Sequence, residues 1–233
     1  MGATWYEPAT TLAFVAAATQ RVRLLSHVLV LPYRHPLLAA KQFATLDRLS
    51  GGRVIIGVGS GHLKPEFRSL GIDHAARAAI SDEYLDALAV ALENDVSSFS
   101  GRVVSWRDMM VAPRPLQEPR PPLWVGGNTP AMARRAGERG DGWVPWQIGL
   151  EDFAARARLA REAHRGSGRA GAFTAVAPIA AGRVEDVGEL IATVAAWRRA
   201  GADAVHLGLT HDGPAHLIEL LEQVAQRVLP QFA

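Results

Sequence analysis

Residues 121–143 read PPLWVGGNTPAMARRAGERGDGW, and this stretch decides the fold. Residues 123–126 are a short apolar run that ends in glycine, which predicts a buried strand. Thr129 and Pro130 follow as the N-cap and the first residue of a helix. Gly140 ends that helix in the left-handed conformation, and a second strand opens directly after it. The stretch therefore predicts a strand, a glycine turn, a helix and another strand.

The glycine turn in this stretch is a candidate anion site. Gly126 and Gly127 let a ligand come close to the main chain, because they carry no side chain. The N–H groups of Asn128 and Thr129 lie at the positive end of the helix dipole, an arrangement suited to phosphate. The alternative is an ordinary turn in which the glycines only relieve crowding.

Strands and helices alternate through the rest of the chain. The strands are nearly uniform apolar runs, as expected when both faces of a parallel sheet are covered. This pattern predicts an α/β fold, either doubly wound or a (β/α)₈ barrel with six of its eight strands. Residues 1–233 contain no long linker or repeat, so we expect a single domain. The expected strands are 22–31, 53–58, 122–126, 142–145, 172–180 and 204–210; the expected helices are 8–21, 37–50, 81–95, 129–139, 151–165, 185–200 and 214–228; a hairpin is expected over 99–111.

Composition excludes several classes of function. The 233 residues include no cysteine, which removes disulfides and thiolate chemistry, and the sequence contains no recognised metal-binding motif. The formal charge is +2 and no basic run alternates with aromatic residues, so nucleic acid is not an expected partner. No segment approaches the roughly 18 apolar residues that span a membrane. We expect a cytoplasmic protein that acts on a small molecule.

A second glycine cluster, GVGSG at residues 57–61, follows the strand 53–58. It is not a dinucleotide fingerprint, because Gly61 is followed by His62 and a loop and not by the start of a helix. The glycines are better interpreted as making room for a planar ring at the end of the strand. His62 lies just beyond that end, on the side where barrel active sites are found.

Together these motifs resemble the luciferase-like flavin and deazaflavin oxidoreductases, and most closely their coenzyme F420-dependent branch. The resemblance rests on LDRLSGGR at 46–53, GVGSG at 57–61, WVGGNTP at 124–130 and GDGW at 140–143. It implies a luciferase-like (β/α)₈ barrel and an enzyme that transfers a hydride between F420 and a small organic substrate. An FMN-dependent monooxygenase of the same family is the alternative.

The resemblance also implies roles for individual residues. In the family, a strand bulge with a non-prolyl cis peptide supports the ring of the cofactor, and the corresponding bond here is His27–Val28. From the residues alone, the preferred interpretation of His27 is an ordinary buried histidine with its polar atoms satisfied. The catalytic residue is not identified, and His27 and His62 are the candidates. The implied cofactor-binding residues are His27, Val28, Gly59, Gly126, Gly127, Asn128 and Thr129.

Other polar and aromatic residues receive mainly structural interpretations. Asp47 and Arg53 lie near a turn, where we expect a salt link or a loop brace. Trp5 and Tyr6 resemble aromatic residues that rim the pocket in the family. Three arginines of the helix 129–139 are expected on its solvated face, although either of the first two could approach an anionic cofactor tail: Arg134, Arg135 and Arg139.

The family's first strand, first helix and most of its second strand have no counterpart here. We therefore expect a chain truncated at its start, with strands 22–31 and 204–210 as unpaired edges. Pairing of these edges with another chain would give a homodimer. A third hypothesis follows, in which a shortened barrel binds cofactor or oligomerises without catalysis.

Overall fold

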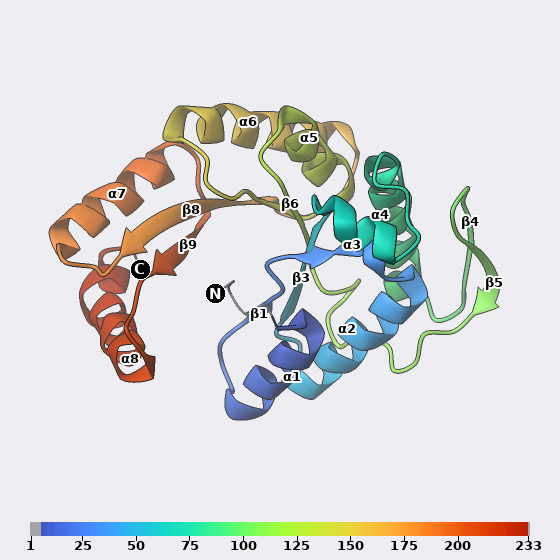
Figure 1. The fold of residues 1–233 in the computed structure, drawn as a ribbon, viewed down its shortest axis with the longest axis horizontal. Coiled ribbons are helices and arrows are strands. Elements are labelled where there is room, and N and C mark those ends of the chain that lie inside the picture. Colours follow the sequence, from blue (N-terminus) through green and yellow to red (C-terminus); the bar gives the residue numbers. More distant parts are fainter. Residues whose placement is uncertain (1–5, 233) are drawn as a thin grey trace. The chain divides into compact units, whose positions relative to one another are not determined.

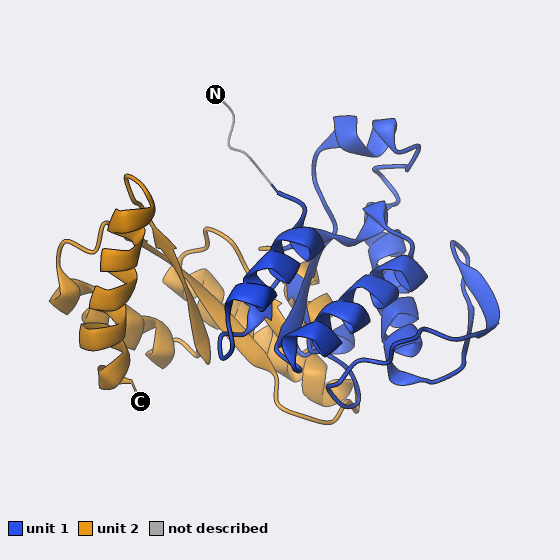
Figure 2. Ribbon diagram, turned by 90° about the horizontal axis from the view of Figure 1, so that it is seen from below, with its two compact units in different colours: residues 1–126, 138–141 blue, residues 127–137, 142–233 orange. Residues whose placement is uncertain are grey.

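A computed structural model describes residues 6–232 of the chain, and Trp5 lies outside this range. The chain divides into two compact units (Figure 2). Unit 1 comprises residues 1–126 and 138–141, and unit 2 comprises residues 127–137 and 142–233. Within residues 6–232, no helix is both long enough and apolar enough to cross a membrane.

Unit 1 is built around one central strand, which is paired on both sides. β3 pairs in parallel with β1 and β2 on one side and with β6 on the other. β4 and β5 form a separate antiparallel hairpin (Figure 1). The elements are α1 (Pro8–Ala18), β1 (Leu24–Leu25), β2 (Leu29–Val30), a 3₁₀ turn (Leu31–Tyr33), α2 (Pro36–Ser50), β3 (Val54–Gly59), α3 (Lys64–Ser69), α4 (Arg77–Glu93), β4 (Ser97–Ser100), β5 (Ser105–Met109) and β6 (Leu123–Gly126).

Unit 2 repeats the alternation of strand and helix. Its strands run parallel in the order β7, β8, β9, and within residues 6–232 the outer edge of β9 pairs with no strand. All six expected strand positions are therefore occupied. The elements are α5 (Pro130–Arg139), β7 (Gly142–Val144), α6 (Leu150–Gly166), β8 (Thr174–Gly182), α7 (Val187–Arg199), β9 (Ala204–Leu209), α8 (Pro214–Gln223), a π-helical turn (Val224–Val228) and a 3₁₀ turn (Leu229–Gln231).

The expected continuous strand 22–31 is wrong, because the structure breaks it into β1 and β2. At the break, the Ser26 hydroxyl donates to the Gly57 carbonyl oxygen and accepts from the Gly57 N–H, both at 2.9 Å. A side chain thus replaces the main-chain ladder at this point. The next peptide, His27–Val28, is cis, as the resemblance implies.

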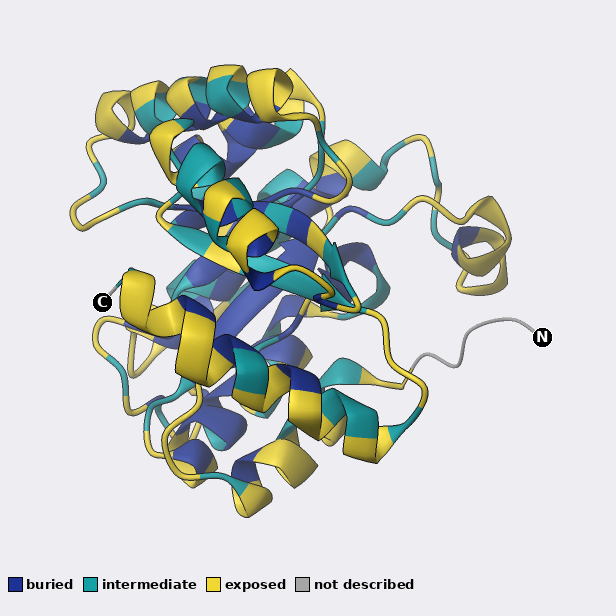
Figure 3. Cartoon of the chain, turned by 90° about the vertical axis from the view of Figure 1, so that its left-hand side faces the viewer, coloured by how far each residue is buried: buried dark blue, intermediate teal, exposed yellow. Residues whose placement is uncertain are grey.

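The core of each unit is apolar. Figure 3 colours the chain by burial, with buried residues in dark blue along strands and on parts of the helices. In unit 1, Phe43 and Leu46 of α2 are buried. In unit 2, Trp143 stacks on Phe153 with 5.3 Å between ring centroids, and neither side chain is exposed. These contacts cover one face of each sheet layer and leave the polar faces of the helices in water.

Asp47 and Arg53 have the structural role predicted for them. The Asp47 carboxylate accepts from the main-chain N–H of Leu116 at 2.8 Å and of Gln117 at 3.0 Å, which anchors the proline-rich connector to α2. The Arg53 guanidinium donates to the carbonyl oxygens of Ala16 and other residues at the end of α1. Asp47 is therefore a loop brace and Arg53 a helix cap.

A buried ion cluster fixes the start of β6. Arg120 is 6% exposed, and its guanidinium bonds Glu93 at 2.8 Å and Asp141 at 2.5 Å. The Asp141 carboxylate also accepts from the N–H of Leu123 at 2.7 Å. Asp141 therefore orients both the buried arginine and the first residue of the strand.

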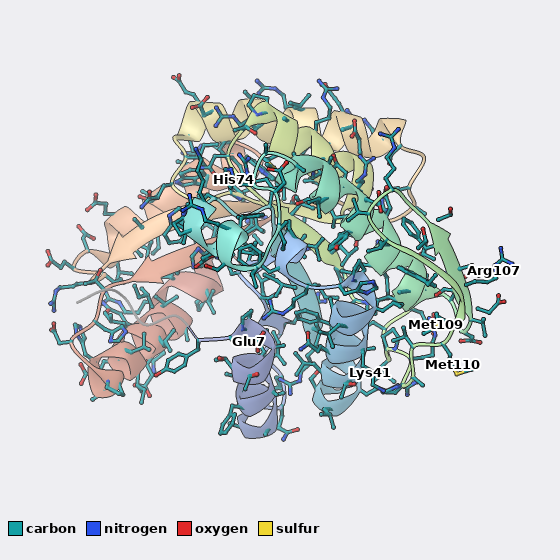
Figure 4. All side chains as sticks on the ribbon, turned by 45° about the vertical axis from the view of Figure 1, so that its right-hand side comes forward. Glu7, Lys41, His74, Arg107, Met109 and Met110 are labelled. Atoms are coloured by element: carbon teal, nitrogen blue, oxygen red, sulfur yellow. The ribbon has the colours of Figure 1, made fainter. Side chains whose placement is uncertain are left out.

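The hairpin β4–β5 depends on one carboxylate of α4. Its strands carry a stacked pair, Phe99 and Trp106, while the side chains of Arg107, Met109 and Met110 lie on its outer side (Figure 4). Glu83 accepts hydrogen bonds of 2.7–2.8 Å from three consecutive main-chain N–H groups in the hairpin loop, those of Arg102, Val103 and Val104. This contact joins the hairpin loop to the body of unit 1.

We expect the hairpin loop to loosen in acid. Partial burial acts to raise the pKa of Glu83, but the bonds from Val104, Val103 and Arg102 outweigh it, and the pKa lies below the usual value of 4.5. A lowered folded-state pKa contributes stability above pH 4.5 that is lost as the pH falls through the folded value. The protection of the amides of residues 102–104 against hydrogen exchange, corrected for the intrinsic pH dependence of exchange, should fall below pH 4.5. E83Q should show fast exchange at pH 7 already, whereas E222Q, on an exposed glutamate of α8, should not. Protection factors of residues 102–104 that stay constant from pH 7 to below pH 4.5 in the unsubstituted protein would contradict this brace.

Candidate functional site

The turn Gly127–Thr129 in unit 2 has the helix-start geometry expected from the sequence. The Thr129 hydroxyl oxygen accepts from the N–H of Met132 at 3.2 Å, and its carbonyl oxygen accepts from that of Ala133 at 3.0 Å. The predicted N-cap is therefore confirmed. Within residues 6–232, the main-chain N–H groups of Asn128 and Thr129 have no acceptor.

Position 127 requires glycine because of its main-chain conformation and the atoms around it. Its φ is +130°, and a Cβ at this position would lie 2.7 Å from Cγ of Met132. The crowding that enforces glycine therefore comes from the first turn of α5, beneath the turn. Glycine was expected here because it leaves room for a ligand. The contacts give a different reason, which is that a larger residue would collide with Met132.

Two tryptophans hold the turn from outside α5, and sequence reasoning missed both roles. The indole Nε1 of Trp143 donates to the Gly127 carbonyl oxygen at 2.8 Å. The Asn128 side chain accepts from the N–H of Trp146 at 2.8 Å and donates to the Trp146 carbonyl oxygen. The conspicuous GDGW motif contains Trp143, but nothing in its spacing indicates what the indole contacts.

The donor set of this turn fits a phosphate group. Two adjacent N–H groups at the N-terminus of α5, which have no acceptor among residues 6–232, offer main-chain hydrogen bonds and a favourable dipole to an anion. The side chains of Asn128 and Thr129 are already engaged with Trp146 and Met132. A ligand would therefore be bound by the main chain of the turn.

His206 of β9 adds a titratable ring to unit 2. Its ring centroid lies 5.8 Å from that of Trp146. Burial lowers the pKa of His206, which favours the neutral imidazole at physiological pH.

Unit 1 brings together the residues expected at the strand bulge. Val28 packs on Gly59, where an added Cβ would lie 2.8 Å from Cγ2 of Val28. At Gly57 an added Cβ would lie 1.9 Å from the Ser26 carbonyl oxygen, so this glycine makes room for protein and not for a planar ring. His27 is exposed, which corrects the expectation of a buried histidine.

The remaining expected residues lie at the ends of strands. His62 is exposed and follows β3, as expected, and Gly126 is buried at the end of β6, next to β3 in the sheet of unit 1. Gly127, Asn128 and Thr129 belong to unit 2. The structure thus brings the expected residues together as one group in each unit.

Tyr33 ends the 3₁₀ turn that follows β2. Its hydroxyl donates to Glu66 of α3 at 2.8 Å, and its ring packs edge-on against Phe67. Burial, the hydrogen bond and the charge of Glu66 raise the pKa of Tyr33 to about 12. This tyrosine stays protonated at physiological pH and secures α3, a helix that the sequence analysis did not predict.

Arg135 corrects the expected solvated face of α5. It is 8% exposed, and its guanidinium lies 2.7 Å from the thioether sulfur of Met132. Arg134 is exposed as expected, and Arg139 pairs with Asp86 at 3.2 Å. Arg134, the arginine nearest to the turn in sequence, is therefore solvated, whereas Arg135 is packed against Met132.

Two open cavities in unit 2, of about 430 and 410 Å³, lie away from these residues. One lies between the end of β8 and α7, and the other between β9, α7 and the C-terminal turns. Neither is lined by Gly127, Asn128 or Thr129, so cavity size does not identify the candidate site.

Comparison with known proteins agrees with the fold. The family model described as luciferase-like monooxygenase matches residues 1–226. An FMNH₂-dependent dimethylsulfone monooxygenase from Pseudomonas putida is 36% identical over 141 residues, which are 59% of this chain and 38% of that protein. The match thus spans less than two fifths of this curated relative's length.

Solved structures show the same architecture. A monooxygenase from Streptomyces bottropensis has a TM-score of 0.80 at 23% identity, covering 97% of this chain and 83% of that one. An F420-dependent secondary alcohol dehydrogenase has a TM-score of 0.82 at 17% identity, and the match covers 96% of this chain and 84% of that one. At these identities the likeness shows the fold alone, and it confirms the predicted α/β class of luciferase-like barrels with six parallel strands.

Proposed function

Because this chain belongs to the luciferase-like monooxygenase family, we propose that it is an oxidoreductase using a phosphate-bearing flavin or 5-deazaflavin. The observation that carries the proposal is the turn Gly127–Thr129, with its two available N–H groups at the start of α5. Such a cofactor supplies hydride chemistry at its ring, while the protein supplies position and electrostatics. The substrate is a small organic molecule.

We assign the phosphate of the cofactor to Asn128 and Thr129 of unit 2. Both N–H groups donate to phosphate oxygens, and the dipole of α5 adds a favourable field. Because the side chains of these residues are engaged elsewhere, replacing them would act mainly through the shape of the turn.

We assign contact with the ring of the cofactor to the strand bulge of unit 1. The support is the main chain at His27–Val28, packed on Gly59. His27 and His62 are exposed histidines that follow β1 and β3, so both are accessible to a ligand. They remain the candidates for the catalytic residue.

F420 is the first candidate cofactor, because the WVGGNTP and GDGW motifs resemble the F420-dependent branch most closely. FMN is the second candidate, supported by the 36% identity to an FMNH₂-dependent monooxygenase. Both carry phosphate, so the proposed site serves either. A protein that binds cofactor without turning over substrate would support the non-catalytic alternative.

Fluorescence titration with F420 and with FMN tests the proposal. We expect one of them to bind with a dissociation constant in the micromolar range, roughly −8 kcal/mol. G127V should weaken binding at least about tenfold, since it strains a φ of +130° and meets Met132. G149V is the control, because nothing lies within 4 Å of a Cβ at that exposed glycine. If neither cofactor binds the unsubstituted protein, the proposed function is wrong.

A further inference from the structure

The carbonyl of Gly127 has one side-chain partner, and that partner has a consequence for the ligand. A trans peptide is planar, and its C=O and N–H point in opposite directions. The Gly127 carbonyl and the Asn128 N–H belong to the same peptide. When the Trp143 indole holds the carbonyl at 2.8 Å, it directs the Asn128 N–H to the opposite side of the turn.

We infer that Trp143 is a positioning residue that sets the affinity of the turn for phosphate, acting through the Gly127 carbonyl. The inference rests on the proposed function, because the phosphate belongs to the cofactor assigned above. Glycine has little conformational preference of its own, so an external contact has to select the orientation of this peptide. Trp143 supplies that contact from the start of β7.

The indole is a rigid support. Trp143 is fully buried and stacks on Phe153, with an interplanar angle of 23°. Phe153 in turn packs edge-on against Trp197 of α7 at 5.1 Å. The indole N–H therefore has a fixed position, and a buried N–H that lost its acceptor would be costly.

A second contact holds the other side of the same residue. The Asn128 side chain bonds both the N–H and the carbonyl oxygen of Trp146, so rotation of the residue would break two hydrogen bonds. Thr129 uses its hydroxyl on Met132 and leaves its own N–H available. The turn is thereby preorganised, and the ligand does not have to order it.

The variant W143F tests this inference. Phenylalanine keeps an aromatic ring on Phe153 but cannot donate to Gly127. Affinity is measured for two matched pairs: FMN against riboflavin, and F420 against the same deazaflavin without its phosphate-bearing tail. We expect W143F to lose about tenfold for the phosphate-bearing ligand, the worth of one hydrogen bond, and less than about twofold for its phosphate-free partner.

The matched control is W197F, which removes an indole from the other side of Phe153 and leaves the Gly127 contact intact. It should keep the phosphate preference of the unsubstituted protein. Equal loss for both members of a pair in W143F would mean that Trp143 acts only through packing, and an unchanged preference would also overturn the inference. Thermal melting of both variants checks that they are folded.

Inorganic phosphate provides an arm that does not depend on the cofactor. In ¹H–¹⁵N spectra, the amides of Asn128 and Thr129 should shift saturably with phosphate, and more weakly in W143F. Absence of any shift in the unsubstituted protein would refute the inference. Shifts with phosphate but no binding of FMN or F420 would instead refute the proposed function and leave the role of Trp143 supported.

Discussion

Gly57→Ala is expected to unfold unit 1 more readily than any other single methyl addition considered. The new Cβ would lie 1.9 Å from the Ser26 carbonyl oxygen, and this buried main chain beside β3 cannot move aside as a flexible side chain can. Overpacking of cores costs typically 1–3 kcal/mol, and a main-chain collision belongs at the upper end, so we expect about 3 kcal/mol. Urea unfolding monitored by far-UV circular dichroism measures the loss.

The control for this variant is Gly166→Ala, at the end of α6. Nothing lies within 4 Å of a Cβ there, so the change should be neutral or stabilise the protein by up to about 1 kcal/mol. Equal stability of the two variants would show that β1 and β3 are not packed as described.

The second large effect is expected at Arg120. R120M keeps most of the buried volume but removes the ion pair between Arg120 and the carboxylate of Asp141. Breaking a buried pair by removing one partner typically costs 3–5 kcal/mol. Glu93 is partly exposed and regains water, so we expect the lower figure, about 3 kcal/mol. The change is measured by chemical denaturation and by hydrogen exchange at Leu123.

R158M tests whether loss of any arginine has this effect, because Arg158 is exposed on α6. The free energy of unfolding of R158M should differ from that of the unsubstituted protein by no more than about 0.5 kcal/mol. If R158M lost as much stability as R120M, the effect of R120M could not be attributed to the buried ion cluster. Added salt should not reproduce the effect of R120M, since buried pairs are poorly screened.

The order of strands and helices could be predicted because it depends on local patterns. Uniform apolar runs indicate buried parallel strands, and Thr129–Pro130 indicates a helix start, wherever the segments come to lie. The break between β1 and β2 could not be predicted from pattern. It depends on Ser26 reaching Gly57, a contact across 31 positions of sequence. The short α3 was missed because its pattern is too brief for a periodicity.

The candidate site divides in the same way. The donors of the turn follow from a local signature, so Asn128 and Thr129 were named from the sequence. Their supports, Trp143 and Trp146, lie 16 and 18 residues from their partners Gly127 and Asn128. Spacing carries no information about such contacts. The buried position of Arg135 was missed because arginine is rarely buried, and residue type does not indicate its contact with Met132.

The open edge of β9 has a consequence for handling the protein. Residues 204–209 contain no charged residue and no proline, the usual protections of an edge strand, and Val205 is 37% exposed. Main-chain groups along that edge are satisfied by water in dilute solution. At high concentration another strand competes with the water. Association between copies of the protein should therefore increase with protein concentration. Binding is best measured at concentrations at which light scattering shows no association.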